Sequence, residues 1–218
     1  MARGLKNRWR FIDSPSLSPQ ENMRLDESLL ASADEPIFRL YSWQENSFTI
    51  GRFQKIEEFE DLQRYGDSWA KRITGGGLLM HGFDLSYLLI VPTNLLKNRS
   101  VKQSYEYLCE FILNFYKNLG LSAGWAKDLF ADLLCHTPFC QEGFEPYDII
   151  IEGKKIGGNA QKRTKDFILQ HGSIPLFKDD RQKSGYSLQE LGVELSLKMA
   201  KDLLKESFMK TYGVIFDD

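Results

Sequence analysis

The spacing of hydrophobic residues predicts one long helix between residues 101 and 119. Apolar side chains recur there every three or four positions, at Val101, Tyr105, Leu108, Ile112, Phe115 and Leu119. This spacing places them on one face of a helix, which we expect to pack against the core. A serine precedes the segment as a helix cap and a glycine follows it as a stop signal.

Three further segments carry helix signals. Ser-Pro-Gln-Glu at 18–21 has the pattern of a capping box with proline in the first turn, which predicts a helix over 19–31. A short polar helix is expected over about 56–65. A longer helix is expected over about 194–212, where a glycine again follows the last periodic residue.

β-Branched and aromatic residues cluster in short segments that predict strands: residues 37–43, 47–50, 68–73, 78–81, 85–91, 148–151, 154–156, 167–169 and 173–176. The first two segments are interpreted as a hairpin, and Glu152-Gly153 predicts a second, tighter one. Residues 74–77 join 68–73 to 78–81. Because strands and helices do not alternate strictly, we expect an α+β fold with a mixed, largely antiparallel sheet flanked by helices.

Composition and charge narrow the class of protein. The chain has 218 residues, 42% of them hydrophobic, with 28 basic against 30 acidic residues. These values fit a folded globular protein and provide no overall positive charge for nucleic acid or an anionic membrane. The basic N-terminus is not followed by an apolar secretory segment, and the run 87–91 is far short of the roughly 20 residues that span a bilayer. We therefore expect a cytoplasmic protein without nucleic-acid or membrane partners.

Three consecutive glycines, Gly75, Gly76 and Gly77, lie between two predicted strands, with Arg72 before them and His81 after them. Exposed backbone amides beside a guanidinium suit a carboxylate, a phosphate or a thioester carbonyl. The alternative is a flexible turn. The segment has neither the ending of a P-loop nor the spacing of a dinucleotide-binding loop.

A second candidate is the segment 154–161, Lys-Lys-Ile-Gly-Gly-Asn-Ala-Gln. In a strand its two lysines point to opposite faces, so that one can be solvated while the other faces a site. Lys155 is the lysine nearer to the Gly-Gly-Asn bend. The spacing alone leaves a solvated and a ligand-facing Lys155 equally open.

The three cysteines occur in different contexts, and an odd number fits a reducing compartment rather than a disulfide framework. Cys109 lies beside the apolar face of the long helix and is expected in the core. Cys140 has turn residues on both sides, where an accessible thiol can be held. A zinc site from Cys135, His136 and Cys140 lacks a second ligand pair, so we expect no metal. His171 is interpreted as a strand histidine, either structural or in the site.

Taken in order, these segments resemble the biotin/lipoate ligase and octanoyltransferase superfamily, whose enzymes attach lipoyl or octanoyl groups to a lysine of carrier domains. The resemblance covers nearly the whole chain: residues 9–13, 22–27, 41–43, 51–54, 72–77 with His81, 147–149, 153–161, 170–173, 187–191 and the last helix. It implies a single catalytic domain over 1–218 with the class II synthetase/biotin ligase-like fold. The small C-terminal domain of the long lipoate ligases would be absent.

The resemblance also implies a set of site residues. Lys155 would stabilise charge on the acyl carbonyl or carboxylate, and Cys140 would accept the acyl group. The substrate pocket would include Arg72, Gly75, Gly76, Gly77, Leu78, His81, Asp148, Gly158, Asn159, Ala160, His171 and Gly172. The substrate would carry lipoate or octanoate.

Two chemistries are compatible with this resemblance. An octanoyltransferase would pass an acyl thioester through Cys140 and need no cofactor, whereas a lipoate ligase would use ATP and Mg²⁺ and need a separate accessory chain. Cys140 and the missing domain favour the transferase. Against it, Gly77 and Asp148 resemble the ligase pattern, and Gly82 replaces the acidic residue that is common after the preceding histidine. A non-catalytic subunit that binds lipoyl carriers is a third interpretation, although it would not require Cys140 and Lys155.

The implied partners are the apo lipoyl domains of 2-oxoacid dehydrogenase complexes or the H protein of glycine cleavage. Acyl carrier protein is a further candidate as the donor. The sequence does not distinguish a lipoyl from an octanoyl donor, and it does not indicate which carrier is modified.

Overall fold

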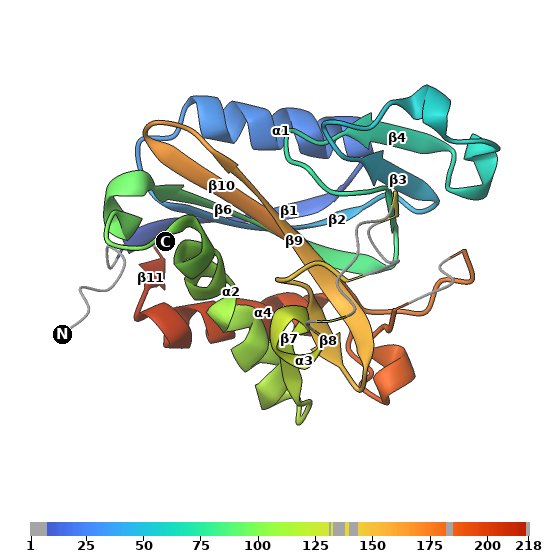
Figure 1. Ribbon diagram of the computed structural model, residues 1–218. Coiled ribbons are helices and arrows are strands. Elements are labelled where there is room, and N and C mark those ends of the chain that lie inside the picture. Colours follow the sequence, from blue (N-terminus) through green and yellow to red (C-terminus); the bar gives the residue numbers. More distant parts are fainter. Residues whose placement is uncertain (1–7, 131, 133–137, 140–143, 182–184, 217–218) are drawn as a thin grey trace.

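The computed structural model describes residues 8–130, 132, 138–139, 144–181 and 185–216. Its centre is an eight-stranded sheet with the order β11-β1-β2-β6-β10-β9-β8-β7 (Figure 1). The strands are β1 (Arg8–Leu17), β2 (Ile37–Trp43), β6 (Asp84–Pro92), β7 (Ala123–Trp125), β8 (Ile149–Ile151), β9 (Lys154–Arg163), β10 (Phe167–Pro175) and β11 (Ile215–Phe216). β1 pairs in parallel with β2 and β11, and the other neighbours are antiparallel. The predicted α+β fold with a mixed sheet is confirmed.

Helices cover both faces of this sheet (Figure 1). α1 (Pro19–Ala31) lies on one face, and α2 (Val101–Asn118) and α4 (Leu197–Tyr212) lie on the other. Both faces need cover because successive side chains of β6 point to opposite faces of the sheet and are apolar. Tyr87 and Leu89 pack in the core under α2 and α4, whereas Leu88 and Ile90 pack under α1.

Three of the four predicted helices are confirmed, one of them with a shifted start. Both α1 and α2 begin with a complete capping box. α4 begins at Leu197 rather than near residue 194, because Ser196 is the residue whose hydroxyl caps the first turn. Gly213 ends α4 in the left-handed conformation, with φ of 65°. α3 (Ala126–Leu129) is a single short turn after β7.

A second, three-stranded sheet has the order β4-β3-β5, formed by β4 (Ser68–Lys71), β3 (Ser47–Ile50) and β5 (Leu79–His81). The predicted hairpin of 37–43 with 47–50 is therefore wrong. Both edges of β2 are already paired, with β1 and β6, so the chain turns away after Trp43 into the other sheet. β3 lies between β4 and β5. The loop 74–77 therefore joins two strands that do not pair with each other.

Two other expectations need correction. The predicted helix 56–65 is instead two 3-10 turns, η1 (Ile56–Glu58) and η2 (Leu62–Arg64), because Asp61 interrupts the segment in the left-handed conformation. β10 is one continuous strand rather than two. The remaining turns are η3 (Thr93–Leu96) and η5 (Gln189–Leu191).

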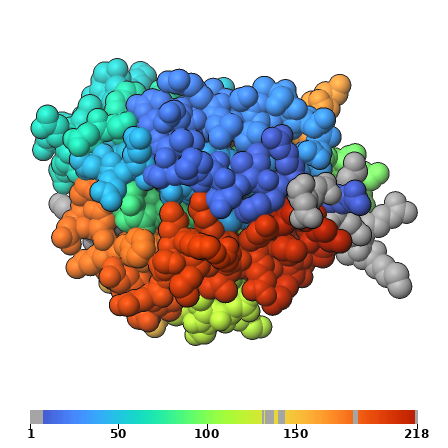
Figure 2. All heavy atoms as spheres, turned by 180° about the vertical axis from the view of Figure 1, so that it is seen from behind, coloured from blue at the N-terminus to red at the C-terminus, as the bar shows by residue number. Residues whose placement is uncertain are grey.

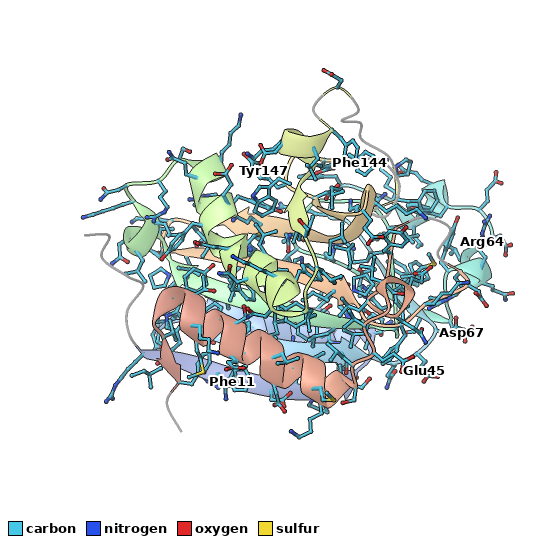
Figure 3. The ribbon with its side chains drawn as sticks, turned by 90° about the horizontal axis from the view of Figure 1, so that it is seen from below. Phe11, Glu45, Arg64, Asp67, Phe144 and Tyr147 are labelled. Atoms are coloured by element: carbon cyan, nitrogen blue, oxygen red, sulfur yellow. The ribbon has the colours of Figure 1, made fainter. Side chains whose placement is uncertain are left out.

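The small sheet forms one end of the molecule, where Glu45, Arg64 and Asp67 are labelled in Figure 3. On the face drawn in Figure 2, the C-terminal residues lie along the N-terminal ones, in agreement with the pairing of β11 with β1. Among the described residues, no helix is long and apolar enough to cross a membrane.

A buried ion pair attaches α1 to the sheet. The Arg39 guanidinium on β2 donates to Asp26 Oδ1 at 2.6 Å and to Asn22 Oδ1 at 2.5 Å, and both acceptors are on α1. It also donates to the Ser14 hydroxyl of β1 at 2.9 Å. Arg39 and Asp26 are fully buried. Each charge therefore depends on the other for the interactions that water would supply.

Replacing Arg39 by methionine should leave the Asp26 carboxylate buried without its guanidinium. We expect the free energy of unfolding to fall by about 3–5 kcal/mol, measured by chemical denaturation. Lys198→Ala, which removes an exposed ion pair with Asp202, is the control and should change it little. A loss in R39M no larger than in the control would contradict a stabilising role for the pair.

Candidate active site

A cavity lies where the small sheet meets the central strands of the main sheet. Its walls come from β2, β6, β9 and β10, from β5, and from the segments before β5 and β8. The lining residues are Tyr41, Trp43, Arg72, Gly75, Gly76, Gly77, Leu79, His81, Ser86, Phe139, Glu145, Asp148, Lys155, Gly158, Asn159, Ala160, His171, Gly172 and Ser173. Segments far apart in the sequence thus meet at one site.

Nearly all of the described residues that the sequence assigned to the site line this cavity: Arg72, Gly75, Gly76, Gly77, His81, Asp148, Lys155, Gly158, Asn159, Ala160, His171 and Gly172. Leu78 does not. Its side chain is buried in the core of the small sheet with Phe48, and its neighbour Leu79 lines the cavity instead. Cys140 lies outside the described residues.

The triple-glycine loop is packed against the turn that follows β3. Arg52 N donates to Thr74 O at 2.8 Å. A side chain at Gly51 would place its Cβ 1.8 Å from Gly76 O, so only glycine permits this approach. The Arg72 guanidinium donates to Gly77 O at 2.6 Å across the same loop. The loop is therefore held in one shape.

The His81 ring has both nitrogens engaged. Arg72 Nη1 donates to Thr49 Oγ1 at 2.6 Å, and Thr49 Oγ1 lies 2.9 Å from His81 Nε2. Because a carboxylate can only accept, His81 Nδ1 donates to Asp84 Oδ2 at 3.0 Å. Burial lowers the pKa of His81, although Asp84 raises it. His81 is accordingly a neutral, fixed part of the wall, stacked on Trp43 with ring centroids 3.8 Å apart.

Asp84 is a residue that the sequence analysis missed. Its Oδ2 also accepts from the hydroxyls of Ser173 at 2.6 Å and Ser86 at 3.2 Å. The buried carboxylate therefore joins β6, β10 and the small sheet. The signal available in the sequence was the three-residue spacing from His81 to Asp84.

His171 connects the other side of the loop. Its Nε2 lies 2.6 Å from Thr74 Oγ1, directly before the triple glycine, and its Nδ1 lies 3.6 Å from Asp26 Oδ2. The histidine thus links the loop to the buried pair beneath α1. Its position is both structural and part of the cavity wall, which unites the two interpretations offered by the sequence.

Asn159 is held by two tyrosines on the face that α2 covers. Its Oδ1 accepts from Tyr87 Oη at 2.6 Å, and its backbone carbonyl accepts from Tyr105 Oη. Gly172 lies opposite on β10, where a Cβ would be 2.2 Å from Asn159 Oδ1. The glycine therefore makes room for the Tyr87–Asn159 hydrogen bond. Tyr105 in turn packs on Tyr147, which is labelled in Figure 3.

Lys155 supplies a buried positive charge. Its Nζ lies 2.7 Å from Asp148 Oδ2, and the two side chains are only 7% and 8% exposed. Lys154 is exposed and lies over the Tyr186 ring, so the predicted opposite facing of the two lysines is confirmed. Burial raises the pKa of the Asp148 carboxyl and outweighs the opposite effect of the Lys155 ammonium.

A bulge between β8 and β9 explains the direction of Lys155. The register shifts between Ile149 and Ile150, so that β9 carries one extra residue there. The extra residue brings Lys155 next to Gly158, where a Cβ would contact Lys155 Cε at 3.6 Å. A regular strand would have placed these two residues on opposite faces.

The cysteines and the candidate metal ligands lie in different parts of the chain. Cys109 is fully buried in the core, as predicted, and burial raises the pKa of its thiol to about 12. Cys135 and His136, like Cys140, lie outside the described residues. Within the described part of the chain, no cluster of three histidine, cysteine or acidic residues could hold a metal ion.

Comparison with known proteins identifies the family. The model of the lipoyl protein ligase A/B catalytic domain matches residues 18–207. The chain belongs to this family. It is therefore an enzyme of the acyltransferase or ligase type in protein lipoylation.

Several curated relatives are named octanoyltransferase. The chain is 37% identical to octanoyltransferase LipM of Anoxybacillus flavithermus over 188 residues, which cover 80% of this chain and 68% of that protein. It is 36% identical to the LipM of Bacillus subtilis with the same coverage. Identity to the LipM of Carboxydothermus hydrogenoformans is 33%, over 96% of this chain and 78% of that protein.

Solved structures agree on the fold. A lipoate-protein ligase A bound with ATP superposes with a TM-score of 0.77 at 22% identity, covering 98% of this chain and 88% of that one. The Thermoplasma acidophilum protein Ta0514 with bound lipoic acid superposes with a TM-score of 0.77 at 24% identity, with the same coverage. Biotin protein ligase from Aquifex aeolicus gives 0.50 at 10% identity, covering 94% and 68%. The predicted biotin ligase-like fold is thereby confirmed.

The lowered pKa of His81 predicts how stability varies with pH. The folded state disfavours the charged imidazole, so below the unfolded pKa of about 6.5 the unfolded chain binds more protons. The contribution of neutral His81 to the free energy of unfolding is fully present above that pH. It is lost as the pH falls toward the lower pKa of His81 in the folded protein. Denaturation of wild type and His81→Gln between pH 7.5 and 5 should show a smaller loss in the variant. Equal losses would contradict a buried neutral His81.

Proposed function

We propose that this protein transfers an octanoyl or lipoyl group to a lysine of a lipoyl domain, through an acyl thioester on Cys140. The observation that carries the proposal is the buried Lys155 ammonium in a cavity with apolar walls from Tyr41, Trp43 and Leu79. Such a cavity suits an acyl chain whose carbonyl oxygen lies near the ammonium.

Support for Cys140 comes from its neighbours in the chain. Phe139 precedes it directly and Glu145 follows five residues later, and both line the cavity. Pro138, two residues before the cysteine, is attached to the site, because its carbonyl accepts from Leu78 N at 2.8 Å and from Gln54 Nε2 at 2.7 Å. The relatives named octanoyltransferase support the transfer of an octanoyl group.

The reaction would proceed in two acyl transfers. The Cys140 thiolate attacks the carbonyl of a donor thioester, a new C–S bond forms, and the donor thiol departs with a proton. The amine of the acceptor lysine then attacks the acyl-enzyme, the amide forms, and Cys140 is released as a thiol. Lys155 stabilises the negative charge that develops on the carbonyl oxygen in each step. Acyl carrier protein would supply the acyl group, and no cofactor is consumed.

The acceptors we propose are the apo lipoyl domains of 2-oxoacid dehydrogenase complexes and the H protein of glycine cleavage. Their target lysine would enter the cavity that contains Lys155.

An ATP-dependent lipoate ligase is the second candidate. The triple glycine and the Asp148 carboxylate in the cavity favour it, since they resemble the ligase pattern. In that case ATP and Mg²⁺ would activate free lipoate, and Cys140 would take no part in the chemistry.

Cys140→Ser separates the two chemistries. With octanoyl-acyl carrier protein and no ATP, wild type should gain the mass of one octanoyl group and then modify a lipoyl domain. The variant should do neither, as measured by intact-protein mass spectrometry, because a serine hydroxyl is a much weaker nucleophile than a thiolate. Cys135→Ser is the matched control. Full activity of C140S with lipoate, ATP and Mg²⁺ would establish the ligase instead.

Lys155→Ala should remove charge stabilisation at the acyl carbonyl and lower the rate of transfer by about 100- to 1,000-fold. Lys154→Ala, on the exposed face, should keep most of the activity. Octanoylation rates of the two variants, with circular dichroism to verify folding, provide the comparison. Equal losses in the two variants would refute the role given to Lys155.

A further inference from the structure

The two oxygens of Asp148 have different surroundings. Oδ2 accepts from Lys155 Nζ at 2.7 Å and from Glu145 N at 2.7 Å. Oδ1 accepts no hydrogen bond from any residue that the structure describes. The side chain is nevertheless more than nine-tenths buried. Because Asp148 lines the cavity, Oδ1 is an acceptor that a donor group of a ligand in the cavity can reach.

Oδ1 lies on the side of the cavity that Gly158 leaves open. A Cβ at Gly158 would be 3.7 Å from Asp148 Oδ1 and 3.9 Å from Lys155 Nζ, an ordinary contact distance. Gly158, Asp148 and Lys155 all line the cavity. An atom in the space left by the absent side chain would therefore contact the vacant acceptor and the ammonium together.

We propose that Asp148 Oδ1 binds the ε-ammonium of the acceptor lysine and removes its proton before the amine attacks the acyl carbonyl. This inference rests on the proposed function. The Lys155 cation would repel an incoming ammonium. The Asp148 carboxylate, next to that cation, would attract the ammonium and offset the repulsion. Because Lys155 occupies Oδ2, the amine and the acyl oxygen would be held on neighbouring groups, Asp148 and Lys155.

The protons balance over the transfer step. Asp148 takes one proton from the ammonium, and the neutral amine attacks the thioester carbonyl. As the C–N bond forms and the C–S bond breaks, the departing thiolate receives the second proton of the nitrogen. Asp148 then returns its proton to water. The raised pKa of the Asp148 carboxyl makes it a better proton acceptor than an exposed aspartate.

Asp148→Asn distinguishes a base from a residue that only holds Lys155. The asparagine carbonyl can still accept from Lys155 Nζ and Glu145 N, whereas an NH₂ donor replaces the vacant acceptor. Loading of the enzyme from octanoyl-acyl carrier protein should remain close to wild type. Transfer from the loaded enzyme to a lipoyl domain should slow by about 100- to 10,000-fold. Asp128→Asn, an exposed carboxylate beside Lys127, is the control and should leave both steps unchanged.

Hydroxylamine provides a second readout, because it is a neutral nucleophile at pH 7 and needs no base. It should discharge loaded wild type and loaded D148N at the same rate. Transfer by wild type should also fall at acid pH as the carboxylate is protonated, and D148N should lose this dependence. The charged groups facing Asp148 are Lys155 and Glu145, and the other charged or titratable groups in the cavity wall are Arg72, His81 and His171.

The outcomes separate the inference from the proposed function. Equal slowing of loading and transfer, slowed discharge by hydroxylamine, or unchanged transfer in D148N would each overturn the role of Asp148 as base. Failure of wild type to load at all would instead refute the acyl-thioester function, and the inference with it.

Discussion

The hydrogen bonds around Asp84 are the interaction on which the site depends. This one buried carboxylate on β6 joins Ser173 of β10 to His81 of the small sheet. From His81 the chain of hydrogen bonds continues through Thr49 to Arg72, which closes the triple-glycine loop. Buried polar groups are costly unless they are paired, so the two sheets have one favourable relative position. The cavity lies at that junction.

The opposite wall depends on β9. The bulge beside Ile149 directs Lys155 to the cavity, and the absence of a side chain at Gly158 leaves space in front of the Lys155–Asp148 pair. The anion of this pair offers one oxygen to the lysine and presents the other to the cavity. A rigid loop on one side and a buried ion pair on the other are suited to fixing an acyl carbonyl and an incoming amine.

Local patterns in the sequence predicted α1, α2, α4 and the β8–β9 hairpin, because caps, periodicity and tight turns act over a few residues. The pairing of β3 with β4 and β5 could not be predicted in this way, since it depends on β1 and β6 occupying both edges of β2. The cavity-lining glycines and Lys155 came from motifs. Asp84 and Thr49 were missed because their partners are set by tertiary contacts, and Leu78 was assigned to the cavity when its neighbour Leu79 lines it.

If Cys140 carries the acyl group as a thioester, that group is bound covalently to the enzyme before it reaches the lipoyl domain. Initial rates measured without ATP, with the octanoyl donor and the lipoyl domain varied together, test it most directly. A covalent acyl-enzyme predicts parallel lines in double-reciprocal plots, because the donor product leaves before the acceptor binds. Intersecting lines, or a requirement for ATP, would rule out a covalent acyl-enzyme intermediate.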